Sequence, residues 1–498
     1  MTERAYPHIY RESLALLTDY YQLTMSYGYW LQKLHQRNSV FTMFFRRPPF
    51  DGGFTVAAGL QPLIEFIRDF RYSESDLAYL AALTGIDGKA TFPEPFLEYL
   101  RDLRFTCDID AVPEGTIVFP YEPLIRVTGP LLQAQLLESP LLNFINFPSL
   151  IATKAARVRL AAQNDTILEF GLRRAQGTDG AVTASRAAYV GGCDGTSNVL
   201  AGKLFGIPVR GTHSHSWVMV FDDESKSFEA FAQALPAGCV FLVDTYNSVE
   251  GIRRAIERGV KLRQQGYELG GVRLDSGDLT YLSVKAREML DEAGFPKATI
   301  VASNELDERL IAEMKNQGAR VNVWGVGTNL VTGQDSPALD GVYKLSAIQE
   351  EDGKWQYKLK LSEQMRKVSN PGVLQIARFS RDGEHVADVI YDQVMGLPEA
   401  CAIVDPLDPT RQRVLGRDLE REDLLIPIMR KGELVYDLPA LSDIRTATNS
   451  NLRSFHPGIL RFVNPHQYVV GMEKGLYDLK VNLIAKIRQG QAAKIVAP

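Results

Sequence analysis

Short apolar segments recur through the middle of the chain, and each is followed by polar or glycine-containing residues. The six segments are 166–171, 207–212, 239–245, 270–275, 299–304 and 321–327. Helix-like apolar spacing occupies 248–266 and 279–293 between them. Strand–helix units at intervals of roughly 25–35 residues predict a parallel sheet, open or closed. Since such a sheet is buried on both faces, its strands are expected to be apolar nearly throughout, as these segments are.

The regions on either side of these units read differently. Residues 13–36 have helix-like spacing, 39–45 resemble a strand, and 111–128 are rich in proline and β-formers. Residues 341–348 and 355–361 resemble paired strands around a polar turn. We therefore predict three regions: an N-terminal α/β domain over 1–145, an α/β domain over 146–370 whose parallel sheet is either open or closed into a barrel, and a C-terminal region over 371–498 that packs on the N-terminal domain.

Bulk composition narrows the class of protein. A chain of 498 residues suggests two or three domains, and a net charge of −5 gives no argument for binding nucleic acid or a membrane. The four cysteines form no CxxC pair, which favours buried thiols in a reducing compartment. The N-terminus lacks the apolar core of a signal peptide, and no apolar run reaches the length of about 18 residues that a spanning helix needs. We expect a cytoplasmic, soluble protein.

Two histidines stand one residue apart in GTHSHSW, residues 211–217, directly after a predicted strand. Three interpretations are open: a buried structural histidine, an HxH metal pair, or one nucleophilic or acid–base histidine beside a neighbour. A catalytic zinc usually needs a third protein ligand, and no other histidine lies in the middle units. This weakens the metal interpretation without excluding it, because carboxylates can also bind a metal.

Charged residues cluster at the end of another predicted strand, in GVRLDSGDL, residues 271–279. Arg273, Asp275 and Asp278 form either an ion pair that fixes a loop or a site that holds an anion and a cation. Arg173 and Arg174 also follow a strand and suit phosphate or carboxylate binding, although paired surface arginines are common. These strand ends are where barrels and doubly wound sheets place their chemistry.

A glycine-containing turn follows the last of the strands, in WGVGTNLVTG, residues 324–333. Gly325, Gly327 and Thr328 suit a turn whose N–H groups cradle a phosphate. Neither the dinucleotide fingerprint nor a P-loop is present. Type I phosphoribosyltransferases are disfavoured, because Asp244 stands alone after its strand and the following phosphate loop is missing. The inventory suits a transfer reaction on a phosphorylated substrate.

At this point the motifs resemble a known family, nicotinate phosphoribosyltransferase, a type II phosphoribosyltransferase. The matching blocks occur in family order at 16–30, 44–50, 57–60, 172–177, 211–216, 272–279, 302–308 and 325–332. The resemblance implies an irregular TIM-like α/β barrel with a second α/β domain formed by the N-terminal part and the C-terminal segment. It also implies a homodimer whose active sites are shared between subunits.

The resemblance further implies an activity in NAD biosynthesis: nicotinate mononucleotide and pyrophosphate are made from nicotinate and 5-phosphoribosyl 1-pyrophosphate (PRPP). Arg273, Thr212 and Tyr21 correspond to nicotinate contacts, with Tyr21 contributed by the partner subunit. Thr328 with Gly327 corresponds to a PRPP contact, and Arg174 is expected to join the anion binding.

In the same family, ATP hydrolysis is coupled to transfer through a phosphohistidine, which corresponds to His215, while His213 falls on a variable position. Asp275 and Asp278 are inferred as partners of Mg²⁺ or ribose, because pyrophosphate leaving needs a metal to absorb charge. Lys154 departs from the family pattern, which has asparagine there, and is expected near the entrance.

Several alternatives remain open. A quinolinate enzyme on the same fold would need several cations for two carboxylates and would lack the ATP-linked histidine of GTHSHS. A nicotinamide enzyme would not need Arg273 to bind a carboxylate. A zinc hydrolase would need bound zinc and further histidines in later strands. A barrel that only binds nucleotides would have no need to retain the histidine, the arginine and both aspartates.

Overall fold

The structure, a computed structural model, describes residues 14–490, which divide into two compact units. The first unit holds the chain up to residue 150 and again from 338 onward, and the second holds 151–337. Residues 338–370, assigned above to the middle domain, therefore belong to the first unit. The reason is strand pairing, because β12 (Gly341–Gln349) lies antiparallel to β1 (Asn38–Phe45).

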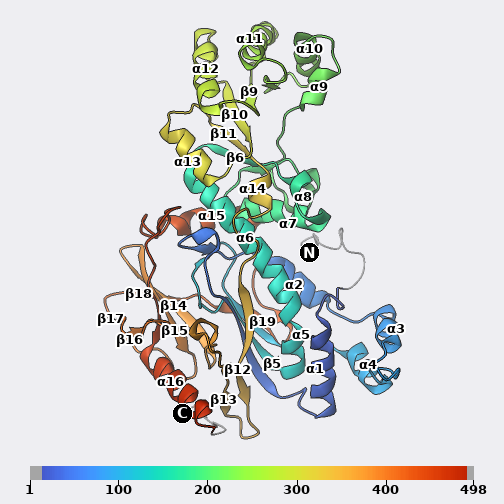
Figure 1. Cartoon of the computed structure of the whole chain (residues 1–498), viewed down its shortest axis with the longest axis vertical. Coiled ribbons are helices and arrows are strands. Elements are labelled where there is room, and N and C mark those ends of the chain that lie inside the picture. Colours follow the sequence, from blue (N-terminus) through green and yellow to red (C-terminus); the bar gives the residue numbers. More distant parts are fainter. Residues whose placement is uncertain (1–13, 491–498) are drawn as a thin grey trace. The chain divides into compact units, whose positions relative to one another are not determined.

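The second unit is built on one six-stranded sheet, drawn in green to yellow in Figure 1. In sheet order its strands are β7 (Gly195–Thr196), β6 (Thr166–Glu169), β11 (Val323–Val326), β10 (Thr299–Asn304), β9 (Gly271–Leu274) and β8 (Val240–Leu242). All five pairings are parallel. Parallel neighbours require crossover connections, which the helices supply. The predicted parallel sheet is confirmed.

The helices of the second unit follow the strands as expected. They are α7 (Gly177–Val190), α8 (Val199–Phe205), α9 (His215–Met219), α10 (Glu224–Ala234), α11 (Ser248–Gln264), α12 (Leu279–Glu292), α13 (Glu308–Asn316) and α14 (Thr328–Val331). Helix α6 (Glu138–Ala162) contributes residues to both units. Asn247, Asp278 and Asp307 each cap the next helix through a side-chain oxygen, so the same polar strand-to-helix turns also start the helices.

One predicted strand is wrong. The segment 207–212 forms only an isolated bridge between Val209 and Thr196. Pro208 has no N–H to donate to a neighbouring strand, and the chain has no regular structure from there until α9 begins at His215, apart from the bridge at Val209. The two histidines of GTHSHSW therefore do not lie on an extended strand, where residues two apart would share a face.

The first unit contains two larger sheets and a two-stranded one. The seven-stranded sheet runs β13 (Trp355–Tyr357), β12, β1, β5 (Ile125–Pro130), β3 (Asp108–Ala111), β19 (Ile426–Arg430) and β20 (Glu433–Leu434). The six-stranded sheet runs β17 (Gln412–Leu415), β16 (Cys401–Val404), β21 (Val470–Glu473), β15 (Glu384–Asp392), β14 (Leu374–Arg381) and β18 (Glu420–Asp423). The small sheet pairs β2 (Thr55–Val56) with β4 (Ile117–Val118).

The remaining helices all belong to the first unit. They are α1 (Tyr20–Leu31), α2 (Leu60–Asp69), α3 (Glu74–Ala82), α4 (Glu94–Asp102), α5 (Leu131–Leu136), α15 (Leu441–Arg453) and α16 (Lys474–Arg488). Helix α1 lies within the helix predicted at 13–36, of which residue 13 falls outside the described residues.

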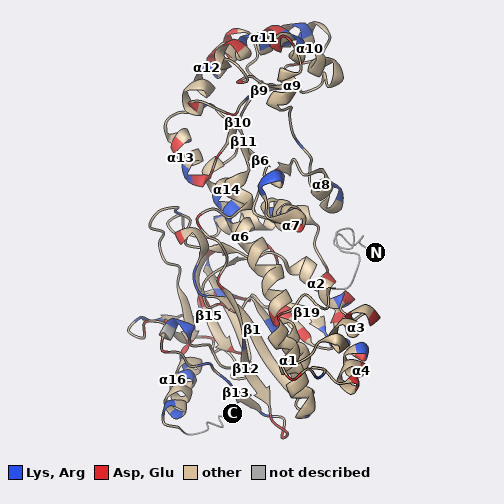
Figure 2. Cartoon of the chain, turned by 45° about the vertical axis from the view of Figure 1, so that its right-hand side comes forward, with Lys and Arg blue, Asp and Glu red and all other residues tan. Residues whose placement is uncertain are grey.

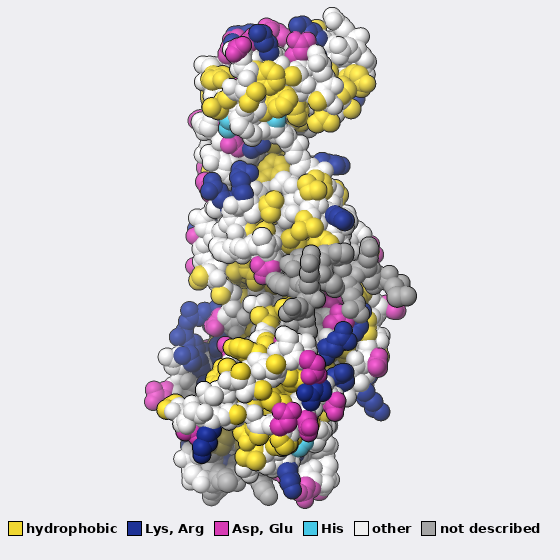
Figure 3. All heavy atoms as spheres, turned by 90° about the vertical axis from the view of Figure 1, so that its right-hand side faces the viewer, with side chains coloured by type: hydrophobic (Ala, Val, Ile, Leu, Met, Phe, Trp, Pro, Cys, Tyr) yellow, Lys and Arg dark blue, Asp and Glu magenta, His cyan; other side chains and the backbone are white. Residues whose placement is uncertain are grey.

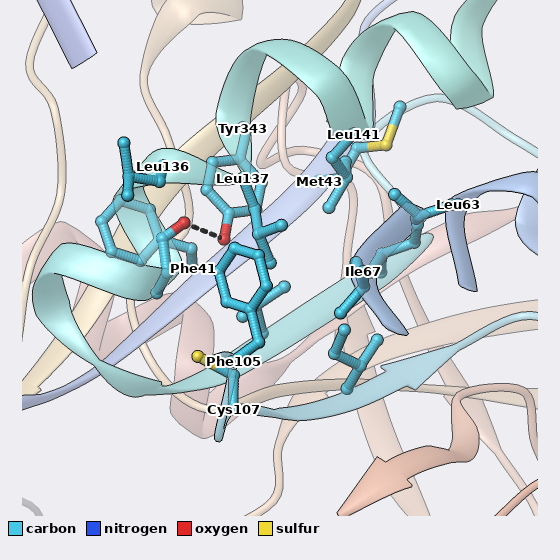
Figure 4. Close-up of a cluster of buried hydrophobic side chains, with 14 of the residues drawn as sticks. Phe41, Met43, Leu63, Ile67, Phe105, Cys107, Leu136, Leu137, Leu141 and Tyr343 are labelled. Atoms are coloured by element: carbon cyan, nitrogen blue, oxygen red, sulfur yellow. Dashed lines mark hydrogen bonds between the residues drawn. The ribbon is translucent and has the colours of Figure 1, made fainter. Parts of the chain in front are cut away.

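The main core of the first unit lies between its seven-stranded sheet and its helices, and Figure 4 shows part of it. The rings of Phe41 and Tyr343, from the paired strands β1 and β12, stack with centroids 5.0 Å apart. The Tyr343 hydroxyl donates to the carbonyl of Ala134 at 2.9 Å, which satisfies its polar end. Burial of each such ring is worth about 2–3 kcal/mol, so this contact ties residues 300 positions apart into one unit.

Charges of both signs are interspersed on helices α10, α11 and α12 in Figure 2, with no field of one sign over them. Among residues 14–490, no helix is long and apolar enough to cross a membrane.

Candidate functional site

Arg273 stands on β9, and three side chains hold its guanidinium in place. Nε donates to Ser303 Oγ at 2.8 Å, Nη1 to Thr212 Oγ1 at 3.0 Å, and Nη2 to Asp275 Oδ1 at 2.8 Å. The guanidinium also lies 5.6 Å from the Phe170 ring centroid. An arginine has five N–H donors, so one N–H on each terminal nitrogen is left without a partner among the described residues.

Asp275 follows β9 and is tied into the same network. Burial raises its pKa, but the hydrogen bond from Ser303 and the charge of Arg273 outweigh this and hold the pKa of Asp275 below its usual value. Asp275 therefore stays ionised at neutral pH, with Oδ1 accepting from Arg273 and Ser303. Its other oxygen, Oδ2, lies 3.8 Å from Nε2 of His215.

His215 is the first residue of α9, and its side chain is 40% exposed. Nδ1 lies 3.1 Å from the hydroxyl of Thr245, and Nε2 lies 4.0 Å from Oδ1 of Asp244. The side chain of Asp244 is fully buried, and its Oδ2 accepts from the Asp275 backbone N–H at 2.9 Å and from Ser276 Oγ at 2.6 Å. Two carboxylates thus flank one accessible imidazole.

His213 has different surroundings, although it is only two residues away. It is 7% exposed, and its ring lies edge-on to Phe231 with centroids 4.8 Å apart. Nε2 accepts from the Leu242 N–H at 3.2 Å, so Nδ1 carries the proton and faces the Ser214 carbonyl. Burial lowers its pKa to about 4. A buried, neutral ring with both nitrogens occupied is not available as a metal ligand.

A small cavity of about 120 Å³ opens beside Arg273. Its lining comes from four strand ends: Phe170, Arg173, Arg174, Arg273, Asp275, Ser303, Asn304, Glu305, Gly325, Gly327 and Thr328. Arg173 and Arg174 are exposed, and their side chains have no polar partner among the described residues. Thr328 begins α14, and its hydroxyl donates to Glu305 at 3.2 Å. The cavity combines free cations with a glycine-containing turn.

The backbone around this cavity is tightly held. A Cβ on Gly325 would lie 2.7 Å from the Phe170 ring, so glycine is needed for the close approach of strand and ring. Asn304 has a positive φ of 124°, a rare conformation for a residue other than glycine. The side-chain amide of Asn329 fixes the next two residues by donating to the carbonyls of Glu305 and Leu306 at 3.1 and 3.3 Å.

Three of the sequence-predicted residues have other surroundings. Asp278 caps α12, accepting from the Tyr281 N–H at 3.0 Å, and does not line the cavity. Tyr21 lies on α1 of the first unit and is 48% exposed. Lys154 is not near an entrance: its side chain is 1% exposed, and Nζ lies 2.8 Å from Oε2 of Glu308, whose Oε1 accepts from Arg157 at 2.8 Å.

Family models match most of the chain. The nicotinate phosphoribosyltransferase (NAPRTase) N-terminal domain matches residues 16–146, the NAPRTase family model matches 166–357, and the C-terminal domain matches 374–480. The chain belongs to the nicotinate phosphoribosyltransferase family. The nicotinate phosphoribosyltransferase of Bacillus subtilis is 42% identical over 482 residues, covering 96% of each chain. The human nicotinate phosphoribosyltransferase is 36% identical over 528 residues, covering 94% of this chain and 96% of the human one.

Solved structures of the family agree with this assignment. The crystal structure of human nicotinic acid phosphoribosyltransferase matches with a TM-score of 0.81 and 32% identity, over 94% of this chain and 99% of that one. A nicotinate-nucleotide pyrophosphorylase from Pyrococcus furiosus matches with a TM-score of 0.65 at 21% identity, which shows the fold alone. The mixed α/β fold with a parallel sheet is thus that of nicotinate phosphoribosyltransferases.

The sequence did not identify the residues that hold the predicted site residues in place. Asp244 was considered only against a type I motif and set aside, yet its carboxylate lies beside His215. Ser303 joins Arg273 to Asp275, and Thr245 contacts His215. Each follows or ends a predicted strand, as Asp275 does, so position at a strand end was the available signal.

Proposed function

We propose that this chain is an ATP-dependent nicotinate phosphoribosyltransferase of NAD biosynthesis. The ring nitrogen of nicotinate bonds to C1 of PRPP while the C1–O bond to pyrophosphate breaks, and pyrophosphate leaves with that electron pair. Nicotinate mononucleotide is the other product. Support comes from family membership and from the arrangement of charged side chains around Arg273.

The geometry of Arg273 is the single observation that carries the choice of substrate. Ser303, Thr212 and Asp275 fix its plane, while one N–H on each terminal nitrogen remains for a ligand. Two parallel N–H donors match the two oxygens of a carboxylate. Nicotinate has this carboxylate and nicotinamide does not, so the arginine favours nicotinate. Thr212, bonded to the same arginine, is the second proposed contact.

His215 is the proposed carrier of phosphate from ATP. With Thr245 accepting from Nδ1–H, the lone pair of the neutral ring lies on Nε2. This nitrogen bonds to the γ-phosphorus while the bond to the β-phosphate oxygen breaks, and ADP leaves with that pair. The positive charge left on the ring lies near Asp244 and Asp275, which stabilise it. The phosphohistidine is hydrolysed after transfer.

The donor set fits Mg²⁺ bound together with substrate. Oδ1 of Asp244 has no hydrogen-bond partner among the described residues, and Oδ2 of Asp275 faces the same imidazole. Carboxylate oxygens suit Mg²⁺, which commonly uses one or two carboxylates plus phosphates. Within residues 14–490 no three His, Cys, Asp or Glu side chains form a metal cluster, so the phosphates would complete the coordination. Bound Mg²⁺ would neutralise charge on the pyrophosphate leaving group.

The anion subsite is proposed at the glycine turn. Thr328 and Gly327 would contact PRPP through hydroxyl and backbone N–H, and Arg174 would add charge. Asp278, which caps α12 through Oδ1, keeps one carboxylate oxygen for a ribose hydroxyl or metal-bound water. This role is weaker than that of Asp275, because Asp278 does not line the cavity.

The sheet of the second unit is proposed to be part of an irregular TIM-like barrel. In chain order its strands run β6, β7, the bridge at Val209, β8, β9, β10 and β11, and β11 pairs with β6. Pairing of the first strand with the last is the order of a closed barrel. The seam between Val209 and β8 is where the irregularity would lie.

A homodimer with shared active sites is proposed to complete the nicotinate site. Tyr21 is half exposed on α1, where its ring is free to stack on the pyridine ring bound by a partner subunit. Large exposed apolar side chains of the second unit, Val199, Met219 and Val220 among them, would be covered by the partner. Figure 3 shows hydrophobic side chains gathered on the upper part of one face.

Turnover with defined substrates tests the reaction. The protein is incubated with nicotinate or nicotinamide, PRPP and Mg²⁺, with and without ATP, and mononucleotide formation is followed. We expect product from nicotinate and stimulation by ATP. Product from nicotinamide but not from nicotinate would refute the substrate assignment.

Labelled ATP separates the two histidines. We expect His215→Ala to abolish transfer of the γ-phosphate to the protein, because it removes the nucleophile. Thr245→Val should reduce labelling, because it releases Nδ1. Labelling that survives in His215→Ala and disappears in His213→Ala would assign the phosphate to the other ring.

A further inference from the structure

A second cavity, of about 830 Å³, lies within the first unit. Stretches within 46–53, 119–121, 403–413 and 465–471 line it, and none of the residues assigned above to catalysis or substrate binding does. Small-molecule sites typically occupy about 300–1,000 Å³, so the cavity has the size of a metabolite site. The side chains that line the cavity indicate the chemical class of this metabolite.

The charged residues of this lining are mostly arginines. Arg46, Arg411 and Arg413 line the cavity, and Asp405 is the one carboxylate among its lining residues. Asp405 is engaged by two backbone N–H groups, of Leu407 at 2.8 Å and of residue 408 at 3.2 Å. An excess of cations around a concave surface attracts an anion.

Two of these arginines have no polar partner. The side chains of Arg46 and Arg413 make no hydrogen bond or ion pair with any residue the structure describes, and the guanidinium of Arg46 lies 5.8 Å from the centroid of the Phe44 ring. Arg411, in contrast, lies 3.2 Å from Asp408. Guanidinium groups bind phosphate through paired N–H donors, so the two free arginines suit a phosphate group.

An aromatic wall occupies another part of the lining. The rings of Phe119 and Tyr468 stack with centroids 4.2 Å apart, and both line the cavity beside the half-buried Tyr121. Planar rings pack well against such surfaces. A ligand that satisfies both parts of the lining therefore carries a phosphate and a planar ring.

The backbone at this cavity is strained. Tyr121 has φ of 70°, and Phe50 and Asp51, inside the lining stretch 46–53, have φ of 61° and 47°. Residues other than glycine seldom adopt these angles, and such strain concentrates at ligand sites and switch regions. One strained residue, Tyr121, lines the cavity, and the other two lie in sequence between its lining residues Pro48 and Gly52, which is an observation independent of the charge of the cavity.

We propose that this cavity binds a nucleoside monophosphate, with the phosphate at Arg46 and Arg413 and the base against Phe119, Tyr121 and Tyr468. None of the residues assigned above to the transfer lines this cavity, so its ligand acts as a regulator and not as a substrate of the transfer. The inference stands independently of the proposed reaction, because it concerns binding alone.

Calorimetry with AMP and with inorganic phosphate tests this on the full chain. We expect AMP to bind, and Arg413→Ala and Arg46→Ala each to weaken that binding by at least about tenfold. Arg381→Ala is the matched control, because Arg381 is an exposed arginine on strand β14 that pairs with Asp418 outside the cavity. It should leave AMP affinity within about twofold. Thermal unfolding of each variant reports whether it has folded.

Hydrogen exchange locates the bound nucleotide. We expect AMP to protect 403–413 and 465–471, and to do so equally in Thr328→Val, which alters the proposed catalytic subsite instead. Protection confined to 325–332, or binding lost only in Thr328→Val, would overturn the proposal by placing AMP at the catalytic subsite. Phosphate binding as tightly as AMP would overturn the assignment of a nucleotide. Absence of binding would overturn the site.

Discussion

Each unit of the molecule holds an arginine bound to an aspartate, and the two pairs differ in what surrounds them. In the first unit, the side chains of Arg378 and Asp388 are 4% and 0% exposed. In the second, those of Arg273 and Asp275 are 14% and 31% exposed and lie at a cavity. The chemistry of the pairs is the same, so the surroundings decide what each pair does.

The pair in the first unit is closed to solvent. Arg378 Nη2 donates to Asp388 and to the Ile117 carbonyl at 2.7 Å, and the Tyr468 hydroxyl donates to Asp388 at 2.9 Å. The pair in the second unit leaves one N–H on each terminal nitrogen of Arg273 for a ligand. A pair closed to solvent therefore stabilises the fold, whereas a pair open to a cavity can bind a ligand.

The largest effect, a loss of stability, is expected from Arg378→Met. Removing the cation leaves Asp388 buried without its charge partner, which typically costs about 3–5 kcal/mol of the free energy of unfolding. Urea unfolding, followed by circular dichroism, measures the loss. Arg273→Met is the control and should change stability by less than about 1 kcal/mol, because Asp275 is partly solvated. Equal losses in the two variants would show that the distinction between closed and open pairs is wrong.

The second effect concerns catalysis. Arg273→Met should lower kcat/KM for nicotinate about 100-fold, equivalent to about 3 kcal/mol, because the substrate carboxylate loses its paired donors. Arg378→Met should leave kcat/KM nearly unchanged under conditions where it is folded. Steady-state kinetics of both variants test this prediction. Full activity of Arg273→Met would remove the basis for assigning nicotinate.

A buried histidine in the second unit and a half-buried histidine in the first should respond alike to acid, unlike the arginine pairs. Burial lowers the pKa of His213, in the second unit, and of His385, in the first, to about 4. Since the unfolded pKa is near 6.5, the unfolded state takes up the proton first, and stability falls as pH drops from about 6.5 to 4. For His213 the loss is up to about 3 kcal/mol.

Unfolding measured across this pH range tests the point. His213→Phe and His385→Phe should each flatten the decline below pH 6.5, while the loss of the ring's hydrogen bonds lowers stability by about 1 kcal/mol at every pH. His456→Phe is a control, because the side chain of His456 is exposed. A decline as steep in His213→Phe as in the parent protein would mean that other groups govern the acid response.

Local features of the sequence were enough to predict much of the second unit. The strand at 299–304 and the helices beginning at 248 and 279 were predicted within two residues, because apolar runs and polar caps are local signals. The segment 207–212 was not, because its apolar letters form only one bridge. Whether a short apolar run pairs depends on its neighbours, which one sequence does not show.

Long-range partners explain the other differences. Strand β12 pairs with β1, about 300 residues earlier, and local patterning could not place it in the first unit. Likewise, spacing alone left His213 and His215 equivalent, and the family resemblance was needed to favour one. The structure separates them by burial, since Phe231 packs against His213 while Asp244, brought from the next strand, lies beside His215.

The smallest effect is expected at helix α13, where an ion pair at the first turn is compared with one at the last turn. Its first residue, Glu308, is held by Lys154 and Arg157, and the end of β10 with the loop that follows carries Ser303 and Glu305 into the cavity. Lys154→Met removes one of two cations and leaves Glu308 paired with Arg157. We expect this to loosen the loop and raise KM for PRPP about fivefold, near 1 kcal/mol, with kcat little changed.

Lys315 provides the matched control at the other end of the same helix, because its Nζ lies 2.6 Å from Oδ2 of Asp165. Lys315→Met also removes one ion pair of α13, but far along the helix from the loop that carries Glu305. Its KM for PRPP should stay within about twofold of the parent value, although it too loses an ion pair of this helix. If both variants raised KM equally, Lys154 would act through general stability of α13, and its proposed positioning of the loop would fail.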